Sequence, residues 1–429
     1  MTTSNDLPRS MYTKLSLMMF LQYAIWGAWL PFLWAFLEGH RGMDGGQIGN
    51  MFAAGAVGAI IGPFVAGQLA DRYFSTQWLL GVSHLLGAVL IWQLATIESE
   101  SGFLIFSLLY GMVYAPTLSL TNSLAFHHIP DRDRDFGRVR KWGTLGWIAV
   151  GLAMGHWLAF KHTPVDVADE VVKAAQYAGR ADAFRLSAFL GAIMGLYCFS
   201  LPKTPPSSGA SSVQSNATMG AIRESRRQPL LTLFLLAVPV SCIHQFYFVH
   251  TEVFLSDQQL AAPGWSKFIF GAGGGGLMTV GQMSELLVIA AVPLVARSAS
   301  RKSLLAVGLV AYGLRMALFA YVDVIPLPVM LTLLTGIALH GLCFGCFIFV
   351  AFMVVDENTS DDVRASAQNL FNLVIIGVGV IVGSKIAGWV SDWAKGDHTK
   401  LFSVPMWGAV ACLALLLLFY PKPTAAIED

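Results

Sequence analysis

The chain has 429 residues, of which 55% are hydrophobic and only 12% are charged. Soluble globular domains carry about 25% charged residues, so this composition excludes an ordinary soluble protein and indicates a polytopic membrane protein. The formal net charge of +1 gives no reason to expect a nucleic-acid partner. The five cysteines all lie in apolar runs, which favours neither a disulfide framework nor a metal site, and we expect no cofactor.

Apolar runs long enough to cross a bilayer recur along the whole chain. A helix needs about 20 apolar residues to span the hydrocarbon core. The first run, which starts at Leu15, is too long for the core of a signal peptide and lacks a small-residue cleavage site, so we expect it to be retained. In chain order the twelve predicted spans are residues 15–37, 46–70, 77–96, 102–127, 140–161, 183–201, 228–256, 275–297, 303–322, 327–355, 364–391 and 401–420.

A hydrophilic stretch separates the sixth and seventh spans. It holds Pro205, Pro206 and a run of Ser and Gly, followed by Arg223, Arg226 and Arg227, a composition typical of a flexible linker with a basic patch. The chain is therefore predicted to be an all-α integral membrane protein with two six-helix bundles. The predicted limits are 1–201 for the N-terminal bundle, 202–227 for the linker and 228–429 for the C-terminal bundle.

Lys and Arg residues are unevenly shared between the loops. The cluster between residues 132 and 141 and the arginines of the linker fall on the cytoplasmic side if the N-terminus lies inside the cell. Because cytoplasmic loops carry an excess of Lys and Arg, we predict that both termini are cytoplasmic. Two sets of six spans around a cytoplasmic linker match the major facilitator architecture, in which substrate binds near the membrane midplane between the two halves.

The loop after the second span supports this architecture. The run from Gly67 to Arg72 resembles the major facilitator loop motif, which begins with Gly and carries an Asp-Arg pair. The later Gly and basic positions of that motif are missing, since Phe74 and Ser75 follow. An Asp beside an Arg can hold helix ends together, so we predict that Asp71 and Arg72 form a conformational latch.

Polar side chains inside the spans are candidates for a binding site. A charge at the centre of a membrane helix costs at least about 2.5 kcal/mol, so Glu285 of the eighth span must face protein or a wet cavity. Gln282 lies three residues earlier, on the same helix face. Two more pairs have i, i+4 spacing, and the first span adds an amide and an aromatic residue; these candidates are Arg140 with Thr144, His340 with Phe344, and Gln22 and Trp26.

This set of side chains favours a neutral ligand that carries hydroxyl groups and a flat ring. Amide, hydroxyl and charged groups bind hydroxyls, and aromatic rings stack on a base or a sugar face. An organic anion would need more unpaired arginines, and a lipophilic drug would need fewer polar groups. Reasoning from these residues leaves a sugar and a nucleoside as alternatives.

Several runs together resemble the nucleoside:proton symporter family of the major facilitator superfamily, over nearly the full length of the chain. The similar runs are 20–30, 114–123, 140–147, 282–285 and 363–368. The resemblance implies the nucleoside contacts residue by residue: Arg140, Thr144 and Trp147 on the fifth span, Gln245 on the seventh, Gln282 and Glu285 on the eighth, and Phe344 on the tenth.

The chain departs from the family pattern at three of the implied site positions. Phe248 replaces an Asn that is frequent on the seventh span, and His340 replaces a Tyr on the tenth. Gly345 stands where an acidic residue often follows the aromatic residue of the tenth span. Because that acid is a candidate for proton coupling, coupling would rest here on Glu285 or on His340, which titrates nearer to neutral pH than a carboxylate, or would be absent.

The resulting prediction is a secondary active transporter that imports nucleosides with protons by alternating access. Its alternatives are a sugar:proton symporter and an uncoupled nucleoside facilitator on the same fold. A membrane enzyme is disfavoured because the spans show no nucleophile–base pair and no metal cluster at a usable spacing. We expect a monomer in the bacterial cytoplasmic (inner) membrane, with a nucleoside, the coupling proton and the lipid bilayer as its partners.

Overall fold

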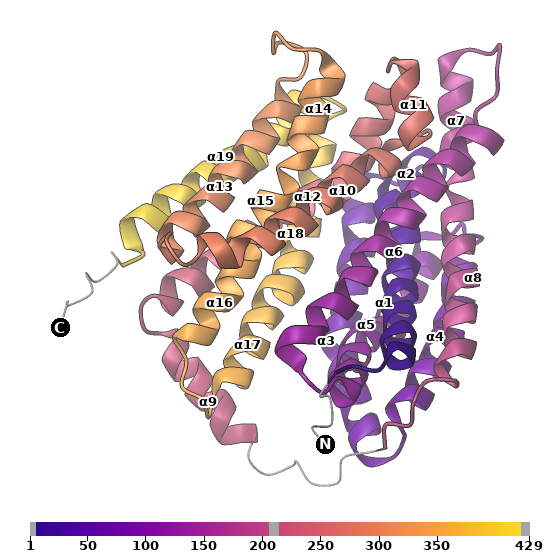
Figure 1. Cartoon of the computed structure of the whole chain (residues 1–429). Coiled ribbons are helices and arrows are strands. Elements are labelled where there is room, and N and C mark those ends of the chain that lie inside the picture. Colours follow the sequence, from indigo (N-terminus) through magenta and orange to yellow (C-terminus); the bar gives the residue numbers. More distant parts are fainter. Residues whose placement is uncertain (1–5, 206–213, 422–429) are drawn as a thin grey trace. The chain divides into compact units, whose positions relative to one another are not determined.

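The computed structural model describes residues 6–205 and 214–421, without the side chains of residues 63–65, 67–72, 133 and 214–218. Every regular element in these ranges is a helix (Figure 1). By its contacts the chain forms two compact units, which are taken separately below. The first unit is Met1–Gly209 with Val249–Thr279, and the second is Ala210–Phe248 with Val280–Asp429.

The first unit contains the helices of the N-terminal half and a segment from the C-terminal half. The chain divides between Gly209 and Ala210, inside the predicted linker. The predicted bundles are continuous stretches of the chain, whereas the contact units combine separate stretches. The predicted bundle limits therefore stay a prediction. The helices of the N-terminal half are α1 (Arg9–Trp29), η1 (Leu30–Phe32), α2 (Leu33–Gly39), α3 (Gly45–Arg72), α4 (Thr76–Leu94), α5 (Glu100–His128), α6 (Arg132–Lys161), α7 (Asp169–Gly179) and α8 (Ala181–Cys198).

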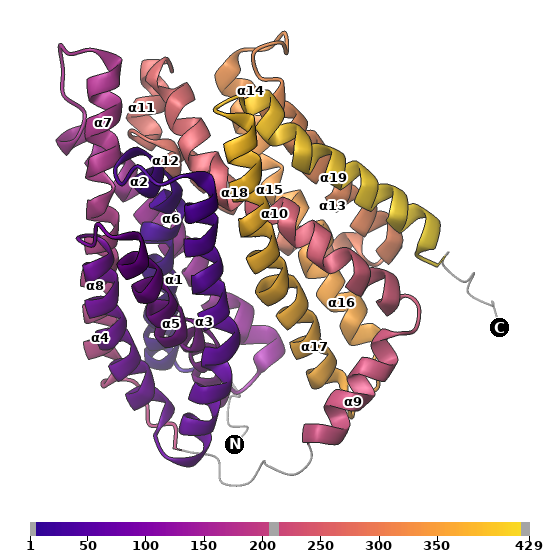
Figure 2. The same ribbon diagram turned by 180° about the vertical axis from the view of Figure 1, so that it is seen from behind.

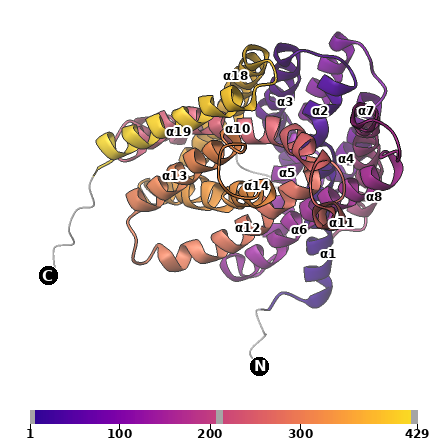
Figure 3. The same ribbon diagram turned by 90° about the horizontal axis from the view of Figure 1, so that it is seen from above.

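The C-terminal half supplies the remaining helices. In it α13 and α19 run side by side (Figures 1 and 3), and α17, η3 and α18 follow one another as a single long helix (Figure 2). These elements are α9 (Gln214–Ser225), α10 (Leu230–Leu260), α11 (Gly264–Phe270), α12 (Gly274–Val295), α13 (Arg301–Ala320), α14 (Val329–Ala338), α15 (His340–Leu342), η2 (Cys343–Phe349), α16 (Val350–Glu357), α17 (Arg364–Asn372), η3 (Leu373–Val378), α18 (Gly379–Ala394) and α19 (His398–Phe419).

Eleven helices among the described residues are long and apolar enough to cross a membrane. Each overlaps one of the predicted spans, from Arg9–Gly39 for the first to His398–Phe419 for the twelfth. The remaining predicted span, 46–70, coincides with α3, part of whose side chains lie outside the described set. The all-helical membrane fold is therefore confirmed.

Two stretches of the long helices are wound as π-helix. They are η2, which starts three residues after His340, and η3 on the eleventh span. A π-turn widens the helix by one residue per turn and occurs frequently at functional sites. The η2 stretch carries Phe344 and Gly345, so the widened turn falls on the part of the tenth span where the sequence predicts substrate contacts.

Glycines bring α12 close to the tenth span. A Cβ atom on Gly345 would lie 2.6 Å from Val288 Cγ1, and one on Gly281 would lie 3.1 Å from His340 Cβ. Small residues let membrane helices approach closely. Ser284 Oγ also donates a hydrogen bond to the Ala338 carbonyl across the same contact (2.6 Å). This packing sets the distance at which α12 presents its polar side chains to His340.

Candidate functional site

A carboxylate, an imidazole and a guanidinium lie in a row inside the second unit. Glu285 Oε2 on α12 is 3.4 Å from His340 Nε2, and His340 Nδ1 is 3.0 Å from Nη1 of Arg315 on α13. His340 and Arg315 are buried, whereas the Glu285 side chain is 17% exposed. Glu285 and His340, which the sequence offers as alternative proton-coupling residues, are therefore in direct contact.

The hydrogen bond from Arg315 assigns the proton of His340. A guanidinium can donate but cannot accept, so His340 Nδ1 is the acceptor. In the neutral imidazole the single N–H then lies on Nε2, the atom that faces the Glu285 carboxylate. With Glu285 ionised, the row carries one positive charge, one negative charge and a neutral ring between them.

Aromatic rings enclose this row. The Arg315 guanidinium lies 4.2 Å from the ring centroid of Tyr247 and 5.1 Å from that of Tyr312, distances at which a cation is attracted by the ring face. The Tyr247 ring stacks on His340 with centroids 4.8 Å apart, and His244 stacks at 5.5 Å. The ring centroids of Phe344 and His340 are 6.5 Å apart. His340 and Arg315 are thereby buried among rings, where a low local dielectric constant strengthens the interaction between them.

Several buried polar atoms near the row have no hydrogen-bond partner among the described residues. They are Gln282 Oε1, the Tyr247 hydroxyl, and Nε and Nη2 of Arg315. Leaving a buried polar group unpaired costs about 1–3 kcal/mol, so these atoms are suited to bind hydroxyl groups or water. Gln282 is only 5% exposed and lies one helical turn before Glu285.

Gln245 is held differently from its predicted neighbours. Its side-chain nitrogen donates to Ser384 Oγ on α18 (3.1 Å), and Ser384 in turn donates to the Val380 carbonyl (2.7 Å). Gln245 is 7% exposed. The second unit thus contains the predicted contacts Gln245, Gln282, Glu285, His340 and Phe344, of which Glu285, His340 and Phe344 are linked by direct side-chain contacts.

The first unit brings together the predicted residues of α1 and α6. The Arg140 guanidinium lies 3.9 Å from the Tyr23 ring centroid, and Trp26 and Trp147 meet edge to face at 5.5 Å. Thr144 lies between Arg140 and Trp147 in the α6 sequence and is half-buried, as they are. A Cβ atom on Gly27 of α1 would lie 2.8 Å from the Trp147 ring, so the close packing of these helices places both indoles at one surface.

Gln22 was predicted as a substrate contact, but its side-chain amide is hydrogen-bonded to other residues inside the first unit. Its nitrogen donates to Thr117 Oγ1 (2.8 Å), and its oxygen accepts from Thr121 Oγ1 (3.0 Å) and lies 2.9 Å from His84 Nε2. Gln22 is fully buried. This geometry favours a role in holding α1 to α4 and α5, and the predicted substrate contact stays a prediction.

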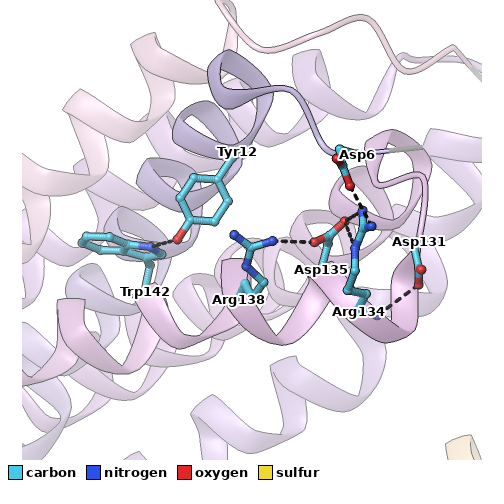
Figure 4. A network of polar contacts seen from close by, with 7 residues as sticks. All are labelled: Asp6, Tyr12, Asp131, Arg134, Asp135, Arg138 and Trp142. Atoms are coloured by element: carbon cyan, nitrogen blue, oxygen red, sulfur yellow. Dashed lines mark hydrogen bonds and ion pairs between the residues drawn. The ribbon is translucent and has the colours of Figure 1, made fainter. Parts of the chain in front are cut away.

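The predicted latch at Asp71 and Arg72 cannot be placed, because both side chains lie outside the described residues. A different charged network is described at the start of α6 (Figure 4). The buried Asp135 binds Arg134 Nη2 (2.6 Å) and Arg138 Nη1 (2.9 Å), and Arg134 reaches Asp6 before α1 (2.8 Å). This network ties the chain segment before α1 to α6.

Sequence reasoning missed a buried ion pair inside the first unit. It joins the helices of the N-terminal half to the segment 249–279. Arg180, between α7 and α8, lies 2.7 Å from Glu252 on α10, and neither side chain is exposed. Ser256 Oγ accepts a hydrogen bond from Arg180 (2.9 Å), and the Gly274 amide donates to Glu252 (3.2 Å). Glu252 within an apolar span was the available signal, because such a charge requires a partner.

The fold and the buried polar residues define a membrane transporter of the major facilitator type, and the comparisons with known proteins identify the family. The chain belongs to the nucleoside H+ symporter family, whose model matches residues 9–424. Its class is therefore proton-coupled nucleoside transport, and the family consists of transporters rather than enzymes. The resemblance seen in the sequence is confirmed.

Relatives and solved structures agree with this assignment. The chain is 32% identical to the putative nucleoside transporter YegT of Escherichia coli strain K12. The 381 aligned residues cover 87% of this chain and 83% of that protein. It is 27% identical to the nucleoside permease NupG of the same organism, with 88% and 87% covered. The crystal structure of the nucleoside transporter NupG matches the fold with a TM-score of 0.81 at 23% identity, over 96% of this chain and 100% of that one.

Proposed function

We propose that this chain imports nucleosides across a bacterial inner membrane and that Glu285 and His340 are its proton-coupling site. The observation that carries the proposal is the 3.4 Å contact between Glu285 Oε2 and His340 Nε2, inside a helical unit and next to half-buried Phe344. A partly exposed carboxylate can receive a proton from a cavity, and an ionisable residue within a membrane span marks a proton or substrate path by default.

The proposed cycle needs only one change of charge at this site. Without the extra proton, Glu285 is an anion whose Oε2 lies 3.4 Å from His340 Nε2. Protonation removes the negative charge, so closing the site around Glu285 no longer buries a carboxylate, which is the costly state in a low-dielectric interior. Proton and substrate would then be released together on the cytoplasmic side by alternating access of the two helical bundles.

Each unit, taken by itself, carries candidate substrate contacts. In the second unit, Gln282 Oε1 is a buried acceptor for a sugar hydroxyl, and Phe344 offers a ring face. In the first unit, Arg140 and Thr144 supply donors, while Trp26 and Trp147 offer faces for the base. Gln245 is retained as a contact by the family resemblance, although its nitrogen is engaged by Ser384. We expect the transporter to work as a monomer with both termini cytoplasmic.

The packing at Gly345 supports the proposal that coupling rests on Glu285 and His340. The family's frequent acid would need space that Val288 occupies, since even a Cβ atom at Gly345 would lie 2.6 Å from Val288 Cγ1. No second carboxylate replaces it among the described side chains that contact His340. The site therefore pairs one carboxylate with a histidine instead of two acids.

The proposal is tested by uptake into vesicles that contain the purified protein. Labelled uridine and adenosine are supplied with and without an inward proton gradient. Accumulation above equilibrium that collapses with a protonophore is the expected result. Equilibration that ignores the gradient, in vesicles shown to hold active protein by exchange of labelled nucleoside, would contradict the proposed coupling site.

A further inference from the structure

Arg315 is a buried arginine that the transport scheme above does not use. It lies in the second half of α13, is 0% exposed, and donates to His340 Nδ1 at 3.0 Å. The described structure shows no carboxylate in contact with it; the nearest route to a negative charge runs through the His340 ring to Glu285. Burying a cation without a partner carboxylate costs free energy, so the presence of Arg315 here calls for an explanation.

We propose that Arg315 is the positioning residue of the proton site: it fixes His340 as the Nε2–H tautomer and holds Glu285 in its anionic form until substrate transport. This inference rests on the proposed role of Glu285 and His340. Because the guanidinium stays protonated at any physiological pH, it is a permanent positive charge that titration cannot remove.

Two physical effects follow from this placement. The hydrogen bond at Nδ1 leaves His340 only one nitrogen that can carry its proton, and that nitrogen faces Glu285. The positive charge also opposes protonation of the ring to imidazolium and favours the carboxylate of Glu285. His340 then acts as a neutral bridge, and the proton that is transported is carried by Glu285.

The neighbouring titratable groups do not provide an equivalent charge. Those packed around the row are His244 and Tyr247 from α10, Tyr312 from α13 and Cys343 from η2. His244 Nδ1 is engaged by the Tyr312 hydroxyl at 2.6 Å. Each of these groups is neutral in its ordinary form near pH 7, apart from a fraction of histidine, so Arg315 is the fixed charge of this cluster.

The test compares Arg315→Met and Arg315→Lys with the unaltered protein in proteoliposomes, by measuring nucleoside exchange and gradient-driven uptake across a range of external pH. Arg315→Met is expected to move the pH midpoint of uptake to the alkaline side, because removing the positive charge on the far side of the His340 ring favours the protonated carboxyl group of Glu285. Uphill accumulation should fall several-fold while exchange persists. Arg315→Lys keeps the charge, so its midpoint should shift less.

Arg301→Gln is the matched control on the same helix. Arg301 pairs with Glu357 at 2.7 Å at the start of α13, so its loss removes an ion pair and a charge without touching the proton site. It should leave the pH midpoint unchanged. An Arg315→Met protein whose exchange and uptake fall together, with an unmoved midpoint, would show that Arg315 only packs helices and would overturn the inference.

A measurement on the unaltered protein covers the case in which the variants do not fold. The ¹⁵N shifts of histidine-labelled protein, with the His340 signals identified by their loss in His340→Gln, report which ring nitrogen carries the proton. The Nε2–H tautomer is expected, and an Nδ1–H ring would overturn the inference. Uphill uptake that survives Glu285→Gln would instead contradict the proposed function, so the two failures are distinguishable.

Discussion

Arg180 and Glu252 form an ion pair in which neither side chain has exposed surface and Nη2 lies 2.7 Å from Oε1. The pair connects the junction of α7 and α8 with α10, two places that are 72 residues apart in the chain. It is further bonded by Ser256 and by the Gly274 amide. The segment 249–279 is thereby fastened to helices of the N-terminal half, which is the contact pattern that places it in the first unit.

Removing either partner of this pair should destabilise the protein strongly. Arg180→Met and Glu252→Gln each leave a buried group without its partner, at an expected cost of about 3–5 kcal/mol. The double variant Arg180→Met/Glu252→Met should lose less than the sum of the two. Thermal unfolding in detergent measures this. Arg185→Met, which breaks a 2.6 Å pair with Asp182 at a side chain that is 44% exposed, should cost about 1 kcal/mol or less. Equal losses at both arginines would contradict the prediction.

Glu285→Gln should separate exchange from accumulation. The amide keeps the shape of the carboxylate and can still face His340 Nε2, but it cannot bind a proton. Exchange of labelled nucleoside across the vesicle membrane should continue, while uphill uptake driven by a proton gradient should disappear. Unchanged uphill uptake in this variant would locate the coupling group elsewhere.

Gly345→Ala should lower stability, although alanine is the better helix former by about 1 kcal/mol. The added methyl group would meet Val288 Cγ1 at 2.6 Å, so α12 or the tenth span must shift. Val288→Ala removes that atom, and the double variant Val288→Ala/Gly345→Ala should recover part of the loss. The melting temperatures of the four proteins give the coupling between the two sites. A rise in melting temperature for Gly345→Ala alone is the result that would refute close packing here.

Trp147→Ala should weaken nucleoside binding without abolishing the fold. Stacking of a base on an aromatic side chain contributes about 1–3 kcal/mol, which corresponds to about a 5- to 150-fold change in Kd. Trp147→Phe keeps a ring and should lose much less. Binding of uridine by calorimetry provides the readout. Trp92→Ala serves as the control, because that indole is 47% exposed on α4 and has no predicted role. A similar Kd in both alanine variants would exclude Trp147 from the site.

Much of the fold was predictable because membrane spans are local features of a sequence. Every predicted span other than 46–70 overlaps a helix that meets the length and hydropathy requirements of a membrane span. The two ends of the tenth span, for example, were predicted at 327 and 355 and lie at Val329 and Glu357. Runs such as 140–147 and 282–285 also allowed the family to be inferred, and the family model confirms it.

The partners of the polar residues were not predictable in the same way. Gln22 and Gln282 both look like amides on apolar spans, yet Gln22 is satisfied by Thr117, Thr121 and His84, whereas the Gln282 oxygen has no partner among the described residues. Arg315 lies within the apolar ninth span, and only the structure shows that it is bonded to His340. Nothing in the residues around Arg180 indicates that it meets Glu252.

The sequence by itself determined which segments enter the membrane, the transporter class and a set of candidate site residues, because hydropathy and motifs are read along the chain. Only the tertiary structure decided that Glu285, His340 and Arg315 form one row, that Gly345 is packed against Val288, and that Arg180 neutralises Glu252. The physical reason is that a buried charge or amide must find its partner within about 3 Å, and that partner comes from a different helix whose contact is set by packing rather than by neighbouring residues.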